Sequence, residues 1–149
     1  CILGNGDRAY EYYRAFMPAA YNNRAEIRQL EPYVQGQTTY STFSPRAGNT
    51  RTSWLTGAAT WAYYSATQYI LGIRPELGGL RIDPCIPSHW DGFKVTRQFR
   101  GKTINITVQN PDSACRGVKT LTLNGESLSD GFVPVEKLSD TNLVEVILG

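Results

Sequence analysis

The stretch TRTSWLTGAATWAYYSATQYILG, residues 50–72, sets the organisation of the chain because it predicts one long buried helix. Its apolar residues recur at spacings of three and four, as a single helical face requires. They are Trp54, Leu55, Ala58, Trp61, Ala62, Ala66, Tyr69 and Ile70. Gly72 follows the last of them and predicts the end of the helix.

The start of this helix carries polar groups that suit an anion. Thr56 is a good N-cap, and Gly57 follows it among the first free backbone N–H groups. Such a helix end stabilises negative charge, and a glycine lets a ligand approach the backbone closely. Arg46 and Arg51 lie just upstream, and Gln37 could donate an amide hydrogen bond or merely satisfy the loop backbone. The residues alone leave both an anion site and a simple helix cap open.

Composition and charge narrow the class of protein. The chain has 149 residues, 41% hydrophobic and 19% charged, which is typical of a folded domain or of the end of one domain followed by a smaller one. A net charge of +2 with scattered Lys and Arg argues against a nucleic-acid or membrane-surface partner. No apolar run reaches the roughly 20 residues of a membrane span, and no signal peptide opens the chain.

The three cysteines, Cys1, Cys85 and Cys115, are an odd number without metal-type spacing. They predict reduced thiols in a cytoplasmic protein, with no disulfide framework and no metal site. Because the chain begins at Cys1 without a methionine, we also expect it to be part of a longer protein.

The two halves of the chain have different periodicities. Asn5-Gly6-Asp7 is a turn and cap signal, and the helical spacing of apolar residues from Ala9 to Phe16 predicts a first helix. Residues 38–50 have a loop composition. Beyond Gly72 the apolar residues alternate, which predicts short antiparallel strands in a sandwich or jelly roll. The strands are expected around residues 80–82, 93–95, 104–108, 118–123, 132–135 and 144–148. Asn124-Gly125 predicts a two-residue hairpin turn.

No catalytic constellation is complete in this sequence. His89 is the single histidine and lies in a turn, so a Cys85–His89 pair would require a facing geometry that the sequence does not favour. Glu31, Asp83 and Asp91 are candidate carboxylates for sugar chemistry, but the two aspartates are typical turn acids and Glu31 is unpaired.

Several motifs in order resemble the C-terminal part of the cellobiose and chitobiose phosphorylase family, over the whole chain and most closely its chitobiose-cleaving members. They are Glu31-Pro32-Tyr33-Val34, Gln37, residues 52–58 (TSWLTGA), residues 70–75 (ILGIRP), residues 82–87 (IDPCIP) and residues 90–93 (WDGF). The resemblance implies an inverting phosphorylase, a glycosyltransferase. In such an enzyme inorganic phosphate attacks the anomeric carbon of a β-1,4-linked disaccharide and yields an α-sugar 1-phosphate and a free sugar. Ser44-Pro45, where cellobiose-cleaving members tend to carry His-Pro, favours N,N'-diacetylchitobiose as the substrate.

The resemblance also implies which residues bind phosphate. The family's Gln and Thr-Gly ligands match Gln37, Thr56 and Gly57 here. Its catalytic aspartate and its Arg and His phosphate ligands would precede residue 1, so we expect no catalytic residue in this chain and no activity from it alone. Asp7, Asp83 and Asp91 are not expected to replace that aspartate. No cofactor is implied, because phosphate is a substrate.

The family fold is an (α/α)6 barrel followed by a β-sandwich. Residues 1–72 would then be the last barrel helices with their active-site loops, and residues 73–149 the C-terminal β-sandwich domain. The expected partners are the disaccharide, phosphate, the remainder of the barrel and a second copy in a homodimer. Two alternatives stay open: an inverting glycoside hydrolase on the same fold, which uses water, and a non-catalytic carbohydrate-binding or structural β module.

Overall fold

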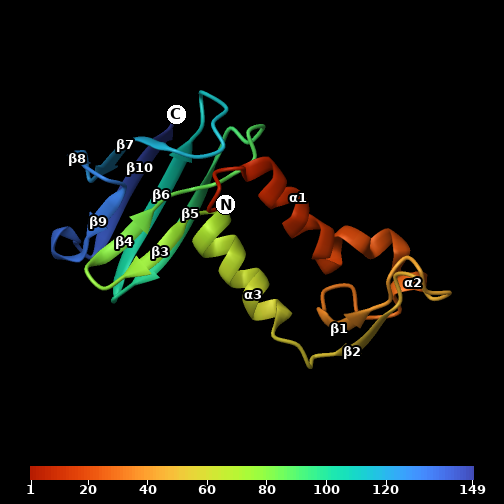
Figure 1. Cartoon of the computed structure of the whole chain (residues 1–149). Helices are drawn as coiled ribbons and strands as arrows, with labels where there is room; N and C mark the ends of the chain where they lie inside the picture. Colours follow the sequence, from red (N-terminus) through yellow and green to blue (C-terminus); the bar gives the residue numbers. More distant parts are fainter. The chain divides into compact units, whose positions relative to one another are not determined.

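The computed structural model describes residues 1–149 and divides them into two compact units (Figure 1). One unit comprises residues 11–65. The other comprises residues 1–10 together with residues 66–149.

The first helix, α1 (Gly6–Phe16), begins as predicted. The side-chain oxygen of Asn5 accepts a hydrogen bond from the backbone N–H of Arg8 at 2.9 Å, which is the usual contact of an N-cap. A 3-10 helix, η1 (Pro18–Arg24), and one short turn of helix, α2 (Ala25–Arg28), follow it. The sequence predicted neither, because their apolar residues are too few to show a helical period.

A β-hairpin occupies part of the segment for which a loop and a long helix were predicted. Strand β1 (Gly36–Thr39) pairs antiparallel with β2 (Thr50–Ser53), with Thr39 opposite Thr50. The hydroxyl oxygens of these two threonines lie 3.0 Å apart. Threonine is β-branched and favours extended backbone, which explains why residues 50–53 form a strand rather than the start of a helix.

The helix itself is shorter than predicted. It runs as α3 (Ala58–Tyr64) and continues as a π-helix, η2 (Ser65–Ile70), in which Leu71 N–H donates to the carbonyl of Ala66 five residues earlier. Gly72 ends it in the left-handed conformation, with φ of 66°, as predicted.

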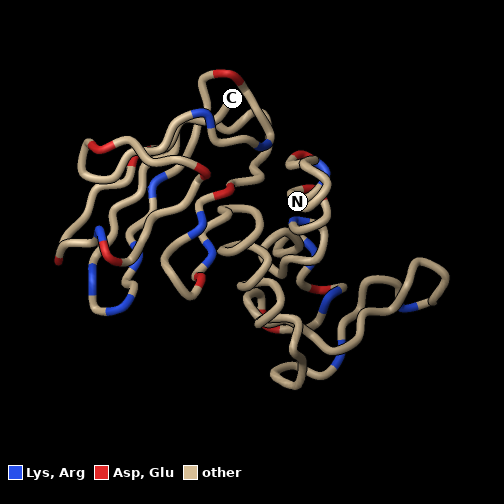
Figure 2. The backbone as a smooth tube through the Cα atoms, turned by 60° about the vertical axis from the view of Figure 1, so that its left-hand side comes forward, with Lys and Arg blue, Asp and Glu red and all other residues tan.

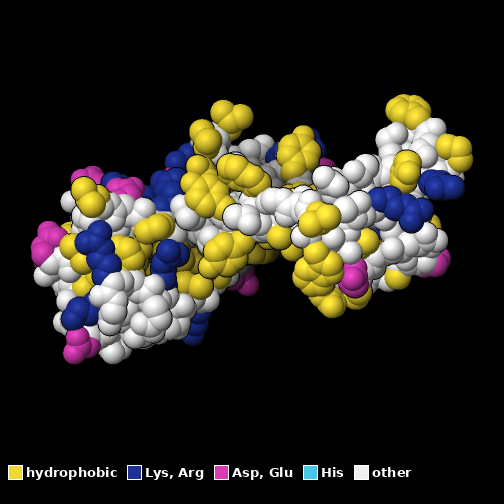
Figure 3. Space-filling view, turned by 90° about the horizontal axis from the view of Figure 1, so that it is seen from below, with side chains coloured by type: hydrophobic (Ala, Val, Ile, Leu, Met, Phe, Trp, Pro, Cys, Tyr) yellow, Lys and Arg dark blue, Asp and Glu magenta, His cyan; other side chains and the backbone are white.

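The prediction that this helix is buried along its apolar face is wrong for most of that face. Ala62 and Ile70 are buried, but the side chains of Trp54 and Trp61 are 67% and 69% exposed. No element of the chain covers most of either tryptophan side chain. Figure 3 shows many apolar side chains exposed at the surface.

The β unit contains two sheets, which confirms a β region after the helices (Figure 1). Strands β3 (Ile73–Glu76), β4 (Gly79–Ile82) and β9 (Phe132–Pro134) form an antiparallel sheet. The second sheet has the order β5-β6-β10-β7-β8. Its strands are β5 (Gly92–Phe99), β6 (Lys102–Gln109), β7 (Val118–Leu123), β8 (Glu126–Leu128) and β10 (Thr141–Leu148). Strands β3 and β8 were not predicted, and Val135 lies in a 3-10 turn, η3 (Val135–Lys137), after β9.

The prediction of a purely antiparallel β half is wrong at one position. Strand β10 runs parallel to β6, with Thr141 opposite Thr103 and Ile147 opposite Gln109, and antiparallel to β7. Alternating apolar residues are equally compatible with both directions, so the sequence pattern carried no information on this point. The direction follows from the long return of the chain between β6 and β10.

The core of this unit is built from alternate residues of the strands. Ile104 and Ile106 in β6, Val144 in β10, and Leu80 and Ile82 in β4 are each at most 1% exposed. The predicted hairpin turn between β7 and β8 is confirmed, since Asn124 and Gly125 both have positive φ, as a type I′ turn requires.

Charged residues are spread along both units without a long run of one sign (Figure 2). None of the helices combines the length and the apolar character needed to span a membrane.

Candidate functional site

Of the three residues predicted to bind phosphate, Gln37 lies in the hairpin, and Thr56 and Gly57 follow its second strand. Gln37 is exposed in β1, and the pairing of β1 with β2 sets it opposite the segment that leads into Thr56 and Gly57. The strand that contains Gln37 therefore pairs with the strand that precedes Thr56 and Gly57. Their role as phosphate ligands stays a prediction.

The prediction that Thr56 is the N-cap is wrong by one position, because α3 begins one residue later than predicted. Gly57 occupies the N-cap position, with φ of −73° and ψ of −3°. The Thr56 hydroxyl oxygen accepts a hydrogen bond from Ala58 N–H at 3.2 Å. Because the hydroxyl accepts in this contact, its own hydrogen remains able to donate to a ligand.

Gly57 leaves the backbone open at this point. A Cβ atom built there would meet only Trp61 Cδ1, at 3.9 Å, so no packing inside this chain requires a glycine. Absence of a side chain instead gives a ligand close access to the peptide groups.

The backbone at the end of β2 and just after it is strained. Thr52 and Trp54 have φ of 59° and 66°, in the left-handed region that non-glycine residues seldom adopt. Each such residue costs on the order of 1–3 kcal/mol, and such conformations cluster at ligand sites. The strained residues lie where the chain leaves the strand and leads toward Thr56 and α3.

The two upstream arginines differ in their placement. Arg51 is exposed in β2, whereas Arg46 is exposed in the loop that joins the two strands. In that loop the Ser44 hydroxyl accepts a hydrogen bond from Arg46 N–H at 3.1 Å, so the Ser44-Pro45 dipeptide belongs to a hydrogen-bonded turn.

An aromatic pair lies beside the same segment. Trp54 Nε1 donates to Glu31 Oε1 at 3.3 Å, and the rings of Tyr33 and Trp54 meet edge to face with centroids 6.1 Å apart. Glu31 is thus engaged by an indole rather than paired with a second carboxylate. Both aromatic side chains are exposed.

The other candidate carboxylates have structural partners in the β unit. Asp83 accepts hydrogen bonds from Arg116 Nε and Nη2, at 3.0 and 2.7 Å, and from Arg74 at 3.2 Å. The hydrogen bond from Arg116 is the main reason that the pKa of Asp83 lies below its usual value. Hydrogen bonds from the backbone and hydroxyl of Ser88 likewise lower the pKa of Asp7. Asp91 is exposed and lies directly before β5.

The structure does not bring Cys85 and His89 into a catalytic pair. Cys85 is 1% exposed and burial raises the pKa of its thiol, whereas His89 is exposed and no hydrogen bond joins the two. The three cysteines are unpaired, and no cluster of three metal-binding side chains forms.

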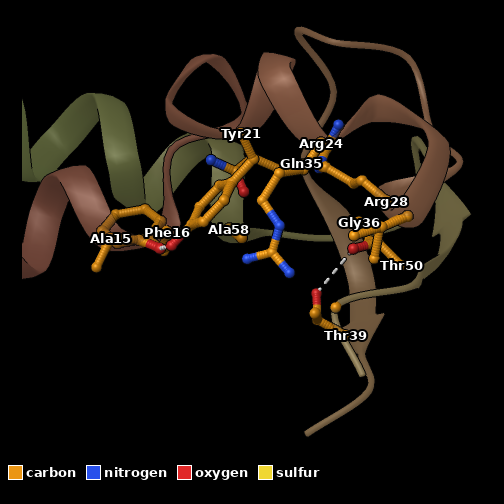
Figure 4. A pocket seen from close by; sticks show the side chains of 12 residues that line it. Ala15, Phe16, Tyr21, Arg24, Arg28, Gln35, Gly36, Thr39, Thr50 and Ala58 are labelled. Carbon is orange, nitrogen blue, oxygen red and sulfur yellow. Dashed lines mark hydrogen bonds between the residues drawn. The ribbon is translucent and has the colours of Figure 1, made fainter. Parts of the chain in front are cut away.

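Sequence reasoning missed one pocket in residues 11–65, with a volume of about 360 Å³ (Figure 4). Arg24, Arg28 and Gln35 line it with Thr39 of β1, and Gln37, Thr56 and Gly57 do not. The i, i+4 spacing of the two arginines and the threonine-rich segments were the signals present in the sequence.

Comparison with known proteins identifies relatives for the whole chain. Residues 1–72 match the family described as glycosyl hydrolase 94 superfamily, catalytic domain, and residues 73–115 match glycosyl hydrolase family 65, C-terminal domain. The chain is 45% identical to N,N'-diacetylchitobiose phosphorylase of Vibrio proteolyticus and 42% identical to that of Vibrio furnissii, in each case over 147 residues. It is 34% identical over 146 residues to solabiose phosphorylase of Paenibacillus borealis.

These alignments cover 98–99% of this chain but only 18–19% of each relative. The motifs that suggested the family and the match to its catalytic domain agree over residues 1–72. The chain therefore belongs to the glycosyl hydrolase 94 superfamily and corresponds to the C-terminal portion of its disaccharide phosphorylases.

Proposed function

We propose that the protein containing this chain is an inverting phosphorylase that cleaves N,N'-diacetylchitobiose with inorganic phosphate. The products would be an α-sugar 1-phosphate and a free sugar. The observation that carries the proposal is the 45% identity to a chitobiose phosphorylase over 99% of the chain. The lower identity to a solabiose phosphorylase, 34%, supports chitobiose over that sugar.

In this proposal Gln37, Thr56 and Gly57 bind the attacking phosphate. Their support is the hairpin register, the free donor hydrogen of Thr56 and the open backbone at Gly57. Backbone N–H groups at a helix start and a hydroxyl donor are groups that stabilise a phosphate dianion. The carboxylic acid that protonates the leaving oxygen would come from a part of the protein outside these residues.

Residues 1–72 would contribute the last helices and active-site loops of the (α/α)6 catalytic barrel, and residues 73–149 the C-terminal β-sandwich. The support for this boundary is that the match to the catalytic domain ends at residue 72, where the second family match begins. A carbohydrate-binding module gives no account of a match to a catalytic domain.

The test uses the full-length protein with chitobiose and with cellobiose, each with and without phosphate. We expect phosphate-dependent release of N-acetylglucosamine 1-phosphate. Glucose 1-phosphate from cellobiose alone would retain the mechanism and correct the sugar. Equal cleavage without phosphate would establish the hydrolase instead and remove the assigned role of Gln37, Thr56 and Gly57.

A further inference from the structure

We propose that the pocket lined by Arg24, Arg28 and Gln35 binds the phosphate group of a sugar phosphate, at a site separate from Gln37, Thr56 and Gly57. The pocket belongs wholly to residues 11–65 and is shown in Figure 4. None of the three residues assigned to the attacking phosphate lines it. The inference therefore goes beyond the proposed reaction.

The residues that line this pocket carry positive charge and no negative charge. It contains two arginines and no Asp or Glu. The side chain of Arg24 forms no hydrogen bond and no ion pair with the rest of the chain. Two guanidinium groups around one cavity repel each other, and an anion between them removes that repulsion.

Arg28 is the stronger part of the argument because it is buried. Its side chain belongs to a residue only 9% exposed, and charged residues are seldom buried without a partner of opposite charge. Its guanidinium donates to the carbonyls of Glu31, at 2.7 Å, and of Val34, which are neutral acceptors. Five N–H donors are available on a guanidinium, so these bonds leave donors for a ligand in the pocket.

Neutral polar groups complete the lining. The Gln35 amide nitrogen has only the sulfur of Met17 as a partner, at 3.9 Å, and a thioether is a weak acceptor. Figure 4 shows the hydroxyls of Thr39 and Thr50 joined by their 3.0 Å hydrogen bond on the strand side. Guanidinium, amide and hydroxyl donors together match the oxygens of a phosphate monoester.

The size and one wall of the pocket indicate a sugar phosphate rather than a bare ion. A volume of about 360 Å³ is far larger than a phosphate ion needs and lies near the lower end of the range for small-molecule sites. The rings of Phe16 and Tyr21 also line the pocket and can cover the apolar face of one sugar ring.

The experiment measures ligand binding to the full-length protein by titration calorimetry. The probes are N-acetylglucosamine 1-phosphate, inorganic phosphate and uncharged N-acetylglucosamine. Measurements are made in a Thr56→Val background, so that the site assigned to the attacking phosphate is already weakened. We expect Arg24→Gln in this background to weaken sugar-phosphate binding about tenfold or more, as loss of a hydrogen bond to a charged group does.

Arg14→Gln is the matched control, because Arg14 is an exposed cation of the same unit that does not line the pocket. It should bind the sugar phosphate as the Thr56→Val protein does. Because Arg24 is exposed and unpaired, Arg24→Gln should unfold at the same temperature as the wild type. Tighter binding of the sugar phosphate than of inorganic phosphate would support a contact between the sugar ring and the rings of Phe16 and Tyr21. Equal binding of the two compounds would overturn the assignment to a sugar phosphate and leave a site for the phosphate ion alone.

The proposal is overturned if Arg24→Gln and Arg14→Gln bind the sugar phosphate equally well. It is also overturned if neither phosphate compound binds in the Thr56→Val background, which is the result expected when a carboxylate from another part of the full-length protein fills the pocket. Phosphorolysis is measured in parallel and tests the proposed function separately. The proposed reaction uses Thr56 to bind the attacking phosphate and assigns no role to Arg24.

Discussion

Replacing Thr56 by valine tests the assignment of the phosphate ligands with little change of shape. The hydroxyl has two functions in the structure and the proposal. It accepts the 3.2 Å hydrogen bond from Ala58 N–H, and its hydrogen is free for a phosphate oxygen. Valine keeps the branched shape and removes both hydrogen bonds.

The two losses have different magnitudes and appear in different measurements. The lost hydrogen bond from Ala58 N–H costs about 0.5–1.5 kcal/mol of stability. A lost hydrogen bond to a charged group costs about 1.5–3 kcal/mol of binding, which corresponds to a phosphate KM about 10- to 150-fold higher. The disaccharide KM should change much less, because in this proposal the hydroxyl faces the anion rather than the sugar.

The assay measures the rate of phosphorolysis by the full-length protein at varied phosphate concentration with saturating disaccharide. It is then repeated at varied disaccharide concentration with saturating phosphate. Thr56→Ser is the control, since it keeps the hydroxyl, and its phosphate KM should stay near that of the wild type. An unchanged phosphate KM in Thr56→Val, with the folded state intact by thermal unfolding, would refute the assignment. Equal rises of the phosphate and disaccharide KM values would indicate a general distortion of the helix start instead.

Three further predictions concern the stability of the β unit. Gly72→Ala should destabilise it by about 1–3 kcal/mol through the positive φ alone, and by more because the added Cβ lies 2.1 Å from the carbonyl oxygen of Asp83. Gly78→Ala, where the nearest atom is 3.5 Å away, should change urea unfolding by less than about 1 kcal/mol. The folded-state pKa of Asp83 is lowered, so its pairing with Arg116 stabilises the protein above the unfolded pKa of about 4 and is lost as the pH falls through the folded pKa. Arg116→Gln should therefore lower the unfolding temperature at pH 7 and lose that effect in acid, and a pH-independent difference would contradict the pairing. Ile106→Ala should cost about 2–5 kcal/mol and Ile106→Val about 0.5–1.5 kcal/mol in denaturant unfolding, because this side chain is 1% exposed, and equal small effects would mean that it lies outside the core.

Much of the β unit could be predicted because its signals are local. The alternation in β6 and β10 and the Asn124-Gly125 turn are confirmed by the structure. The parallel pairing of β6 with β10 could not be predicted, since period-two alternation is the same in both directions.

The helical unit was harder to predict for a different reason. The apolar spacing of residues 50–72 suggested a single helix, but the threonines of β2 pair with β1 and hold residues 50–53 extended. The start at Ala58, the change to a π-helix at Ser65 and the exposure of Trp61 depend on what surrounds the segment. A periodic pattern reports which side chains share a face and says nothing of whether another element covers that face.

The candidate site shows the same division between sequence and structure. The sequence by itself determined the residue types of the predicted phosphate site, Gln37, Thr56 and Gly57, and the family motifs around them, because helix caps and motifs are read from neighbouring residues. Only the tertiary structure decided that β1, which contains Gln37, pairs with β2, and that Arg24 and Arg28 share a pocket without an acidic partner. The physical reason is that strand register and burial arise from contacts between residues distant in the chain, which no local pattern of side chains specifies.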